Sequence, residues 1–255
     1  MKNRWIVSSL MSGAVALLIL GGYAKGQKVE SVTGQEEHHT YRLAAGAHVD
    51  VSYISGPVSV EATDGATAEV SIYRTAPNPA DLAYRKVFIE QTSSGLTIRQ
   101  KTDGTDPDKV NLLNRVVLKL PRQVSVSAKN ISGDFNISGI DGTVDLNGIS
   151  GSVEAKQLNG ALTVSGASGN VRVAVERIND AGLRVSNVSG RIYLRLASDL
   201  NAELSISNTT GGVSNKITGL ALAGVGASSY SARLGLGGPR IVVSNVTGVI
   251  VLQPI

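Results

Sequence analysis

A short phrase that recurs nine times restricts what this chain can fold into. In each copy a glycine follows Ser, Thr, Asn or Asp, and the residue two positions after the glycine is apolar. Apolar residues two apart lie on one face of a strand, and glycine accepts the positive φ of many tight turns. Each phrase therefore predicts a corner followed by a short strand with one buried face. The nine corner glycines are Gly56, Gly133, Gly142, Gly151, Gly160, Gly169, Gly190, Gly211 and Gly248.

The spacing of these glycines favours a β-solenoid. From Gly133 to Gly169 they recur at every ninth position, and the next two intervals, ending at Gly190 and Gly211, are equal to each other and slightly longer than two such steps. Self-similarity at a fixed period is typical of stacked repeats. Two short units predict one coil, and the longer interval predicts a coil with a small outward loop. An antiparallel β-sandwich is the alternative, because short strands at regular spacing also suit that fold.

The coil predicts which side chains are buried. Apolar residues two and four positions after each corner glycine should face the core, with Phe135, Val153 and Val171 in one stack. Four asparagines of Asn-x-Ser/Thr sequences lie three positions before a corner glycine, which favours an asparagine stacked at a corner and bonded to backbone over a glycan acceptor. They are Asn130, Asn187, Asn208 and Asn245.

The first part of the chain, 1–24, has the pattern of an export signal. A basic start precedes the uncharged apolar stretch 5–20, and Gly22 and Ala24 suit the small-residue positions of a cleavage site before Lys25. An uncleaved membrane anchor is the alternative, since the stretch is at the short end of a membrane span. Residues 25–39 are polar and are expected to form a flexible tether, which leaves 40–255 as one β-repeat domain outside the cytoplasm.

Composition argues against several kinds of site. The chain has no cysteine, which excludes disulfides, cysteine-ligated zinc and cysteine nucleophiles. Its formal charge of +4 falls to +2 without Lys2 and Arg4 of the leader, so there is no case for nucleic-acid binding. A calcium-binding nonapeptide repeat needs the motif Gly-Gly-x-Gly-x-Asp. Asp134, Asp141 and Asp145 are not part of such a motif.

Residues 63–129 have the pattern of ordinary β-hairpins rather than of the repeat. Residues 86–91 and 96–100 flank the turn sequence Thr-Ser-Ser-Gly. Asn78 followed by proline suits a helix start, so a short helix is expected over 79–86.

Three sequence stretches together resemble a known family. The pattern HVDVSYISGPVSVEATDG, the strand end VVLKLP followed by SVSAKNISGDFNISG, and the closing RLGLGGPRIVVSNVTGVIVL resemble the bacterial adhesin-like family of β-strand-repeat proteins, a domain of unknown function. The resemblance covers roughly residues 40–252. It implies an exported β-solenoid-like protein, described as an adhesin by inference. The family has no assigned catalytic residues, so none is carried over.

A polysaccharide lyase or hydrolase built on a β-helix is the enzymatic alternative. In a coil of two repeat units, Asn136, Glu154 and Arg172 form one outward column, and Asp145 and Thr163 form another on the opposite face. A glycosidase needs two carboxylates facing each other across about 5–10 Å. A carboxylate stacked beside an arginine instead predicts a salt bridge between Glu154 and Arg172.

Arginines are denser in one stretch of the chain than elsewhere. Four of them are candidates for a face that binds anionic glycans or lipid headgroups, and an ordinary charged surface is the alternative. The four candidates are Arg172, Arg184, Arg191 and Arg195. His38, His39 and His48 are too few and too close to the start to predict a metal site or a catalytic triad. No cofactor is expected.

These observations predict an exported, non-enzymatic β-repeat protein that acts as an adhesin or as a binding or scaffold module of the cell envelope. Its partner would be an envelope glycan or protein, with membrane contact only through an uncleaved N-terminal segment. A membrane-tethered partner of an envelope-stress system is a further alternative.

Overall fold

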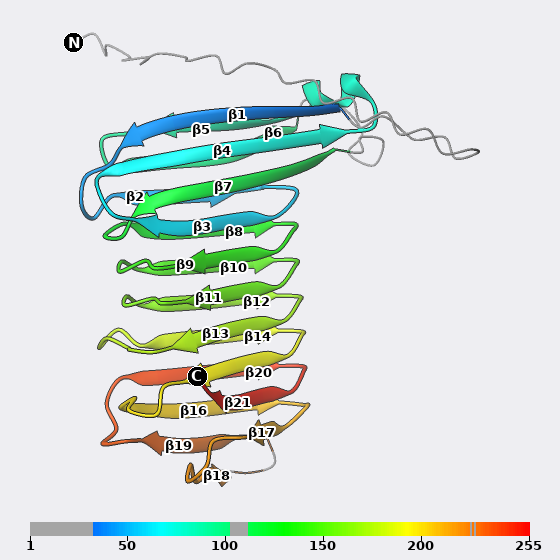
Figure 1. Ribbon diagram of the computed structural model, residues 1–255. Coiled ribbons are helices and arrows are strands. Elements are labelled where there is room, and N and C mark those ends of the chain that lie inside the picture. Colours follow the sequence, from blue (N-terminus) through cyan, green and yellow to red (C-terminus); the bar gives the residue numbers. More distant parts are fainter. Residues whose placement is uncertain (1–32, 103–111, 225, 227) are drawn as a thin grey trace, which may run out of the picture.

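The computed structural model describes residues 33–102, 112–224, 226 and 228–255, which form two long β-sheets stacked face to face (Figure 1). The predicted signal segment 1–24 lies outside the described residues. The first sheet, sheet A, has ten strands, in the order β1 (Thr33–Arg42), β4 (Thr67–Ala76), β7 (Leu113–Pro121), β3 (Val58–Thr63), β9 (Phe135–Ser138), β11 (Val153–Lys156), β13 (Val171–Val175), β15 (Ile192–Leu196), β21 (Ile250–Pro254) and β17 (Val213–Asn215).

The second sheet, sheet B, has eleven strands. Their order is β18 (Ala223–Gly224), β19 (Tyr230–Leu234), β16 (Ala202–Thr209), β20 (Arg240–Val246), β14 (Leu183–Val188), β12 (Leu162–Ala167), β10 (Val144–Ile149), β8 (Ser125–Ile131), β2 (His48–Ser52), β6 (Gly95–Thr102) and β5 (Arg85–Gln91). We call β18 and β19, with the residues that flank β18, the C-terminal cap. One strand from each sheet makes a coil, and the main core is one large apolar cluster between the sheets. A small second cluster contains Ala76 and Leu112.

The middle of the molecule confirms the predicted solenoid and excludes the antiparallel sandwich. Its strands pair in parallel, and Val144 lies opposite Leu162 while Val153 lies opposite Val171, a shift of one predicted coil in each case. Phe135 lies opposite Val153, so the predicted stack is correct. The apolar residues two and four positions after the corner glycines are buried in eight of the nine copies. The exception is edge strand β17, which is half-buried at Val213 and exposed at its last residue.

The structure places the nine corner glycines at bends between strands, for a reason that differs from the expected one. Only Gly56 among them has a positive φ. A Cβ on Gly151 would come within 2.5 Å of the carbonyl carbon of Gly133, and one on Gly169 within 2.6 Å of that of Gly151. The glycines therefore stack on one another, and it is the approach of one coil to the next that leaves no room for a side chain.

The left-handed conformation belongs to a different column, three positions before the corner. Asn130, Asn187, Asn208 and Asn245 all have φ near +55° there, and Gly148 and Gly166 take the same place in the two middle coils. The asparagines do stack, but side chain to side chain rather than to backbone. Asn245 Nδ2 donates to Asn187 Oδ1 at 3.1 Å, and Asn208 Nδ2 donates to Asn245 Oδ1 at 3.0 Å.

The N-terminal end is a cap of antiparallel strands. β4 pairs with β1 and β7, and β5 forms the predicted hairpin with β6. Yet β6 and β7 also pair in parallel with β2 and β3, so the expectation of hairpins alone over 63–129 is wrong. The expected helix 79–86 is a shorter 3₁₀ helix, η1 (Pro79–Ala83), whose first turn is capped by Asn78.

The tether expected over 25–39 is wrong for its second half, because residues 33–39 belong to β1. The guanidinium of Arg74 helps to order this strand. It donates to Glu37 at 2.8 Å and Gln35 at 2.6 Å on β1, and to the carbonyl of Leu82 in η1 at 2.8 Å. A single buried arginine on β4 thus joins the edge strand and the 3₁₀ helix.

The C-terminal end departs from sequence order. Stacking in sequence order would place the coil after Gly211 directly on the coil after Gly190. Instead the last coil, β20–β21, lies between them: Ile250 pairs with Ile192 on one side and with Val213 on the other. The chain thus skips one position, builds β16–β19 beyond it, and returns to fill the gap, so the C-terminus lies part-way along the stack (Figure 1).

Candidate functional site

The four arginines predicted to form one anionic-ligand face lie on two opposite faces. Arg172 in β13 and Arg195 in β15 point outward from sheet A, and Arg191 lies in the turn before β15. Arg184 points outward from β14 of sheet B. The prediction of a single face is wrong because the chain passes from one sheet to the other between β13 and β14, so neighbours in sequence are separated by both sheets.

The outward column of sheet A has the predicted register but a different ion pair. Asn136, Glu154 and Arg172 lie opposite one another in β9, β11 and β13. Glu154 pairs with Lys156 of its own strand at 3.3 Å, rather than with Arg172. The Arg172 guanidinium instead lies 5.2 Å from the ring centre of Tyr193, where the ring face attracts the cation.

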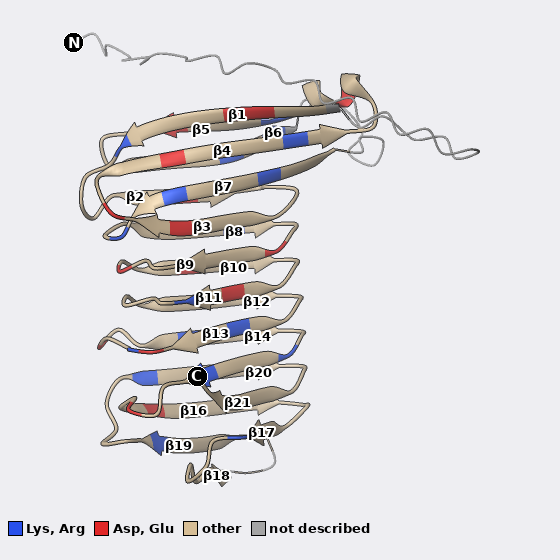
Figure 2. Cartoon of the chain, viewed as in Figure 1, with Lys and Arg blue, Asp and Glu red and all other residues tan. Residues whose placement is uncertain are grey.

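Charged residues of both signs are spread along the whole stack (Figure 2). The distinctive feature is a hollow on the outer face of sheet B. A hollow of about 730 Å³ lies on the outer face of β20, β16 and β19, bordered by residues 221 and 223 of the C-terminal cap. A second, of about 490 Å³, adjoins it toward β12 and shares Arg184, Arg240 and Val242 with it. We call the two hollows together the arginine groove.

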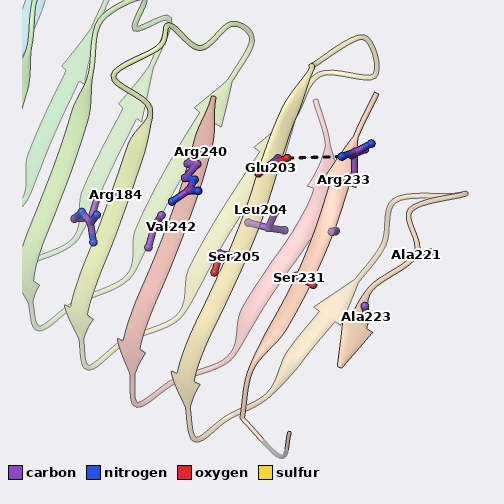
Figure 3. Close-up of a pocket in the computed structure, with 11 residues that line it drawn as sticks. Arg184, Glu203, Leu204, Ser205, Ala221, Ala223, Ser231, Arg233, Arg240 and Val242 are labelled. Carbon is purple, nitrogen blue, oxygen red and sulfur yellow. Dashed lines mark ion pairs between the residues drawn. The ribbon is translucent and has the colours of Figure 1, made fainter. Parts of the chain in front are cut away.

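Strand pairing arranges the polar side chains of the arginine groove in two rows along the solenoid axis. The first row is Arg240, Glu203 and Arg233, from β20, β16 and β19. The second row crosses the same strands at the next outward-facing position of each strand. It contains Thr163, Arg184, Val242, Ser205, Ser231 and Ala223. Hydroxyl groups thus lie among the guanidinium groups (Figure 3).

Two of the three groove arginines have no side-chain partner in the described part of the chain. Glu203 pairs with Arg233, with 3.9 Å between carboxylate and guanidinium (Figure 3). Arg184 and Arg240 make no ion pair or side-chain hydrogen bond with any described residue. Within the described residues, the groove therefore combines two free cations with one cation that a carboxylate neutralises, which leaves it net positive despite Asp180 at its far border.

The backbone beneath the arginine groove is tightly packed. Gly182, at the turn into β14, has φ of +76°, and a Cβ there would come within 2.5 Å of the carbonyl oxygen of Arg240. Leu183 and Leu204 are buried in the core below. Arg184 and Arg240 consequently stand on adjacent, hydrogen-bonded strands, and the ladder fixes the spacing of their backbones.

The histidines are distant in sequence from the residues of this groove. His38 contacts Glu36 at 2.7 Å and Ser71 at 2.9 Å, and His39 lies 3.6 Å from Glu37, all within the N-terminal cap. No group of three or more His, Asp or Glu residues suited to a metal ion occurs among the described residues. In the same cap, burial raises the pKa of Tyr41 above its ordinary value of 10.0.

Sequence reasoning singled out Arg184 but missed Arg240, Glu203 and Arg233. Their alternation with apolar neighbours shows only that each points outward from a strand. Nothing in the sequence brings residue 240 beside residue 184, because that contact depends on the insertion of the last coil. No helix in the described portion is long and apolar enough to cross a membrane.

Comparison with known proteins gives a family and distant structural neighbours. The solved structures similar to the chain include a candidate cell-adhesion protein from Clostridium sporogenes, at 11% identity and a TM-score of 0.49, covering 88% of this chain and 100% of that one. A candidate adhesin from Bacteroides fragilis has 13% identity and a TM-score of 0.47, covering 86% and 97%. No curated protein matches significantly. The family model of Toastrack DUF4097 matches residues 26–229, which confirms the adhesin-like resemblance, and the chain belongs to that family.

Proposed function

We propose that this protein is an exported, non-enzymatic binding module of the cell envelope, and that the arginine groove is its binding face. The observation that carries the proposal is a pair of arginines, Arg184 and Arg240, that stand without a described partner on adjacent strands of a rigid sheet. Two guanidinium groups carried on paired strands can bind an anion without the cost of ordering flexible loops. Export is supported by the leader pattern of residues 1–24, with its expected cleavage before Lys25.

The placement of the carboxylates argues against the enzymatic alternative. Asp145 lies on the outer face of β10 in sheet B, and Glu154 lies on the outer face of β11 in sheet A. Outward residues of two packed sheets point away from each other, so these two carboxylates cannot flank one glycosidic bond. Glu203 within the groove is paired with Arg233.

The experiment compares two pairs of arginines on opposite faces. The full chain carrying Arg184→Gln and Arg240→Gln is assayed on a glycan array and against isolated envelope fractions. The matched control carries Arg191→Gln and Arg195→Gln, which removes the same charge on the side of sheet A. We expect binding to be lost in the first variant and kept in the control. Equal binding by both variants would refute the proposed face.

A further inference from the structure

We propose that the ligand of the arginine groove is an extended acidic polysaccharide that lies along the solenoid axis, across the strands of sheet B. This inference rests on the proposed function and gives the binding face a ligand class. In it, carboxylates along the polymer pair with Arg184, Arg240 and Arg233, and sugar hydroxyls bond with the serine and threonine side chains of the same groove.

The dimensions of the groove favour a polymer over a single sugar or a free ion. The two adjoining hollows extend from Thr163 on β12 to Ala223 on β18. This path crosses six strands, in the order β12, β14, β20, β16, β19 and β18. At about 4.8 Å between strands the path is about 24 Å long, the length of several sugars.

The order of side chains along the groove offers three cations to a chain that carries several anions. Arg184 and Arg240 lie on adjacent strands, and Arg233 lies two strands beyond Arg240. The planar guanidinium group binds a carboxylate through two parallel hydrogen bonds. Beside these cations, in the second row, Ser205 and Ser231 lie opposite each other, and their hydroxyls can both donate to and accept from a sugar hydroxyl.

The shape of the groove favours a glycan chain over a lipid surface. A membrane-binding face presents apolar side chains that enter the acyl boundary. The large apolar residues that border this groove, Leu162, Leu183 and Leu204, are buried beneath it. The remaining apolar lining is small, chiefly alanine, and the surface is concave where a bilayer would require it flat or convex.

Glu203 is expected to compete with the ligand for one of the groove arginines. Its carboxylate lies between Arg240 and Arg233 in the first row, and it pairs with Arg233 at 3.9 Å. A polysaccharide carboxylate must therefore compete with Glu203 for Arg233. Replacing Glu203 with glutamine removes the competitor and the repulsion, and so should tighten binding rather than weaken it.

The test measures binding of fluorescent galacturonate oligomers, from the disaccharide to long chains, to the full chain. We expect affinity to rise with oligomer length and to fall as salt increases. Arg184→Gln with Arg240→Gln should weaken binding at least about tenfold, because hydrogen bonds between charged groups are lost. Glu203→Gln should strengthen it severalfold. The control, Arg191→Gln with Arg195→Gln, should bind within about twofold of the unmodified protein.

Several outcomes would overturn the inference. These are equal losses in the groove and control variants, weaker binding by Glu203→Gln, no dependence on oligomer length, or binding to anionic phospholipid vesicles but not to the oligomers. If the oligomers fail while binding to envelope fractions still requires Arg184 and Arg240, the polysaccharide is wrong and the proposed function stands. If no binding requires these two arginines, both proposals fail.

Discussion

The middle coils and the C-terminal end of this solenoid are made of the same repeat but are assembled differently. From β8 to β15 each coil stacks on the coil before it in sequence, as when Val144 pairs with Leu162 and Leu162 with Leu183. At the C-terminal end, Ile192 instead pairs with Ile250, and a whole further coil of the sequence lies between them. The middle coils thus pair with their neighbours in sequence, whereas, among the described strands, the coils at the C-terminal end are joined to the stack only through the last strands of the chain.

Equivalent repeats therefore do not contribute equally to the assembly of the fold. A middle coil has neighbours that follow directly from chain order. The inserted coil β20–β21 pairs with β14–β15 on one side and with β16–β17 on the other. It also contributes Arg240 to the arginine groove. Structural closure and the proposed binding face therefore depend on the same last coil.

The largest effect should come from deleting residues 240–255. The deletion removes five side chains of the apolar core, those of Ile241, Val243, Val246, Ile250 and Leu252. At about 1.5–3 kcal/mol each, their loss is comparable to the roughly 5–15 kcal/mol that stabilises a whole domain. Hydrogen exchange should show β16–β19 unprotected, with protection retained in β8–β13.

Deleting the chain through Arg42 provides the control at the other end. It removes β1, an edge strand that pairs only with β4 among the described strands. The loss of melting temperature should be clearly smaller. Full protection of β16–β19 in the C-terminal deletion would mean that the inserted coil is dispensable.

A second comparison sets a middle corner against an open glycine of the C-terminal cap. A Cβ on Gly151 would meet the backbone of Gly133 at 2.5 Å, whereas nothing lies within 4 Å of one on Gly224. Gly151→Ala should therefore cost about 1–3 kcal/mol or more, as overpacking does, and Gly224→Ala should be nearly neutral. Urea unfolding measures both costs. Increased hydrogen exchange near residues 140–165 would locate the damage, and uniform loss of protection along the chain would contradict a one-dimensional stack.

A third comparison uses the left-handed column, where the middle has glycine and the end has asparagine. Asn245→Ala should cost about 1–2 kcal/mol, because alanine is strained at a φ near +54°. Asn245→Gly should cost less, since Gly148 and Gly166 hold the same conformation in the middle coils. Thermal unfolding of the two variants checks the order. A larger cost for glycine than for alanine would show that the asparagine hydrogen bonds matter more than the backbone conformation.

The smallest effect concerns alkaline pH at the N-terminal cap. Burial raises the pKa of Tyr41, so the folded chain holds this proton more tightly than the unfolded chain does. The resulting stabilisation is complete below the ordinary pKa of 10.0 and is lost as the pH rises through the higher folded value. Tyr41→Phe should reduce the loss of stability above pH 10, measured by urea unfolding across pH. An unchanged alkaline profile in the variant would contradict the assignment.

Prediction from sequence succeeded where contacts are local and failed where they are not. The one-coil shift that stacks Phe135 on Val153 follows from the regular glycines and apolar pairs, so the middle coils were predictable side chain by side chain. The arginine face was predicted from nearness along the chain, and this criterion grouped Arg184 with arginines of the opposite sheet. Its true neighbour, Arg240, belongs to the last coil of the chain and is far from it in sequence.

The sequence by itself determined the β-solenoid and its buried face, because each repeat contains the alternating apolar residues of a strand and the glycine that lets coils pack closely. It also determined that each corner needs glycine, although the reason proved to be contact between coils rather than the backbone angle. Only the tertiary structure decided the order of the last coils. The parallel ladders of the coils are alike, so the repeat alone does not select the order β15, β21, β17 found in sheet A. That choice brought Arg184 beside Arg240 and so created the groove.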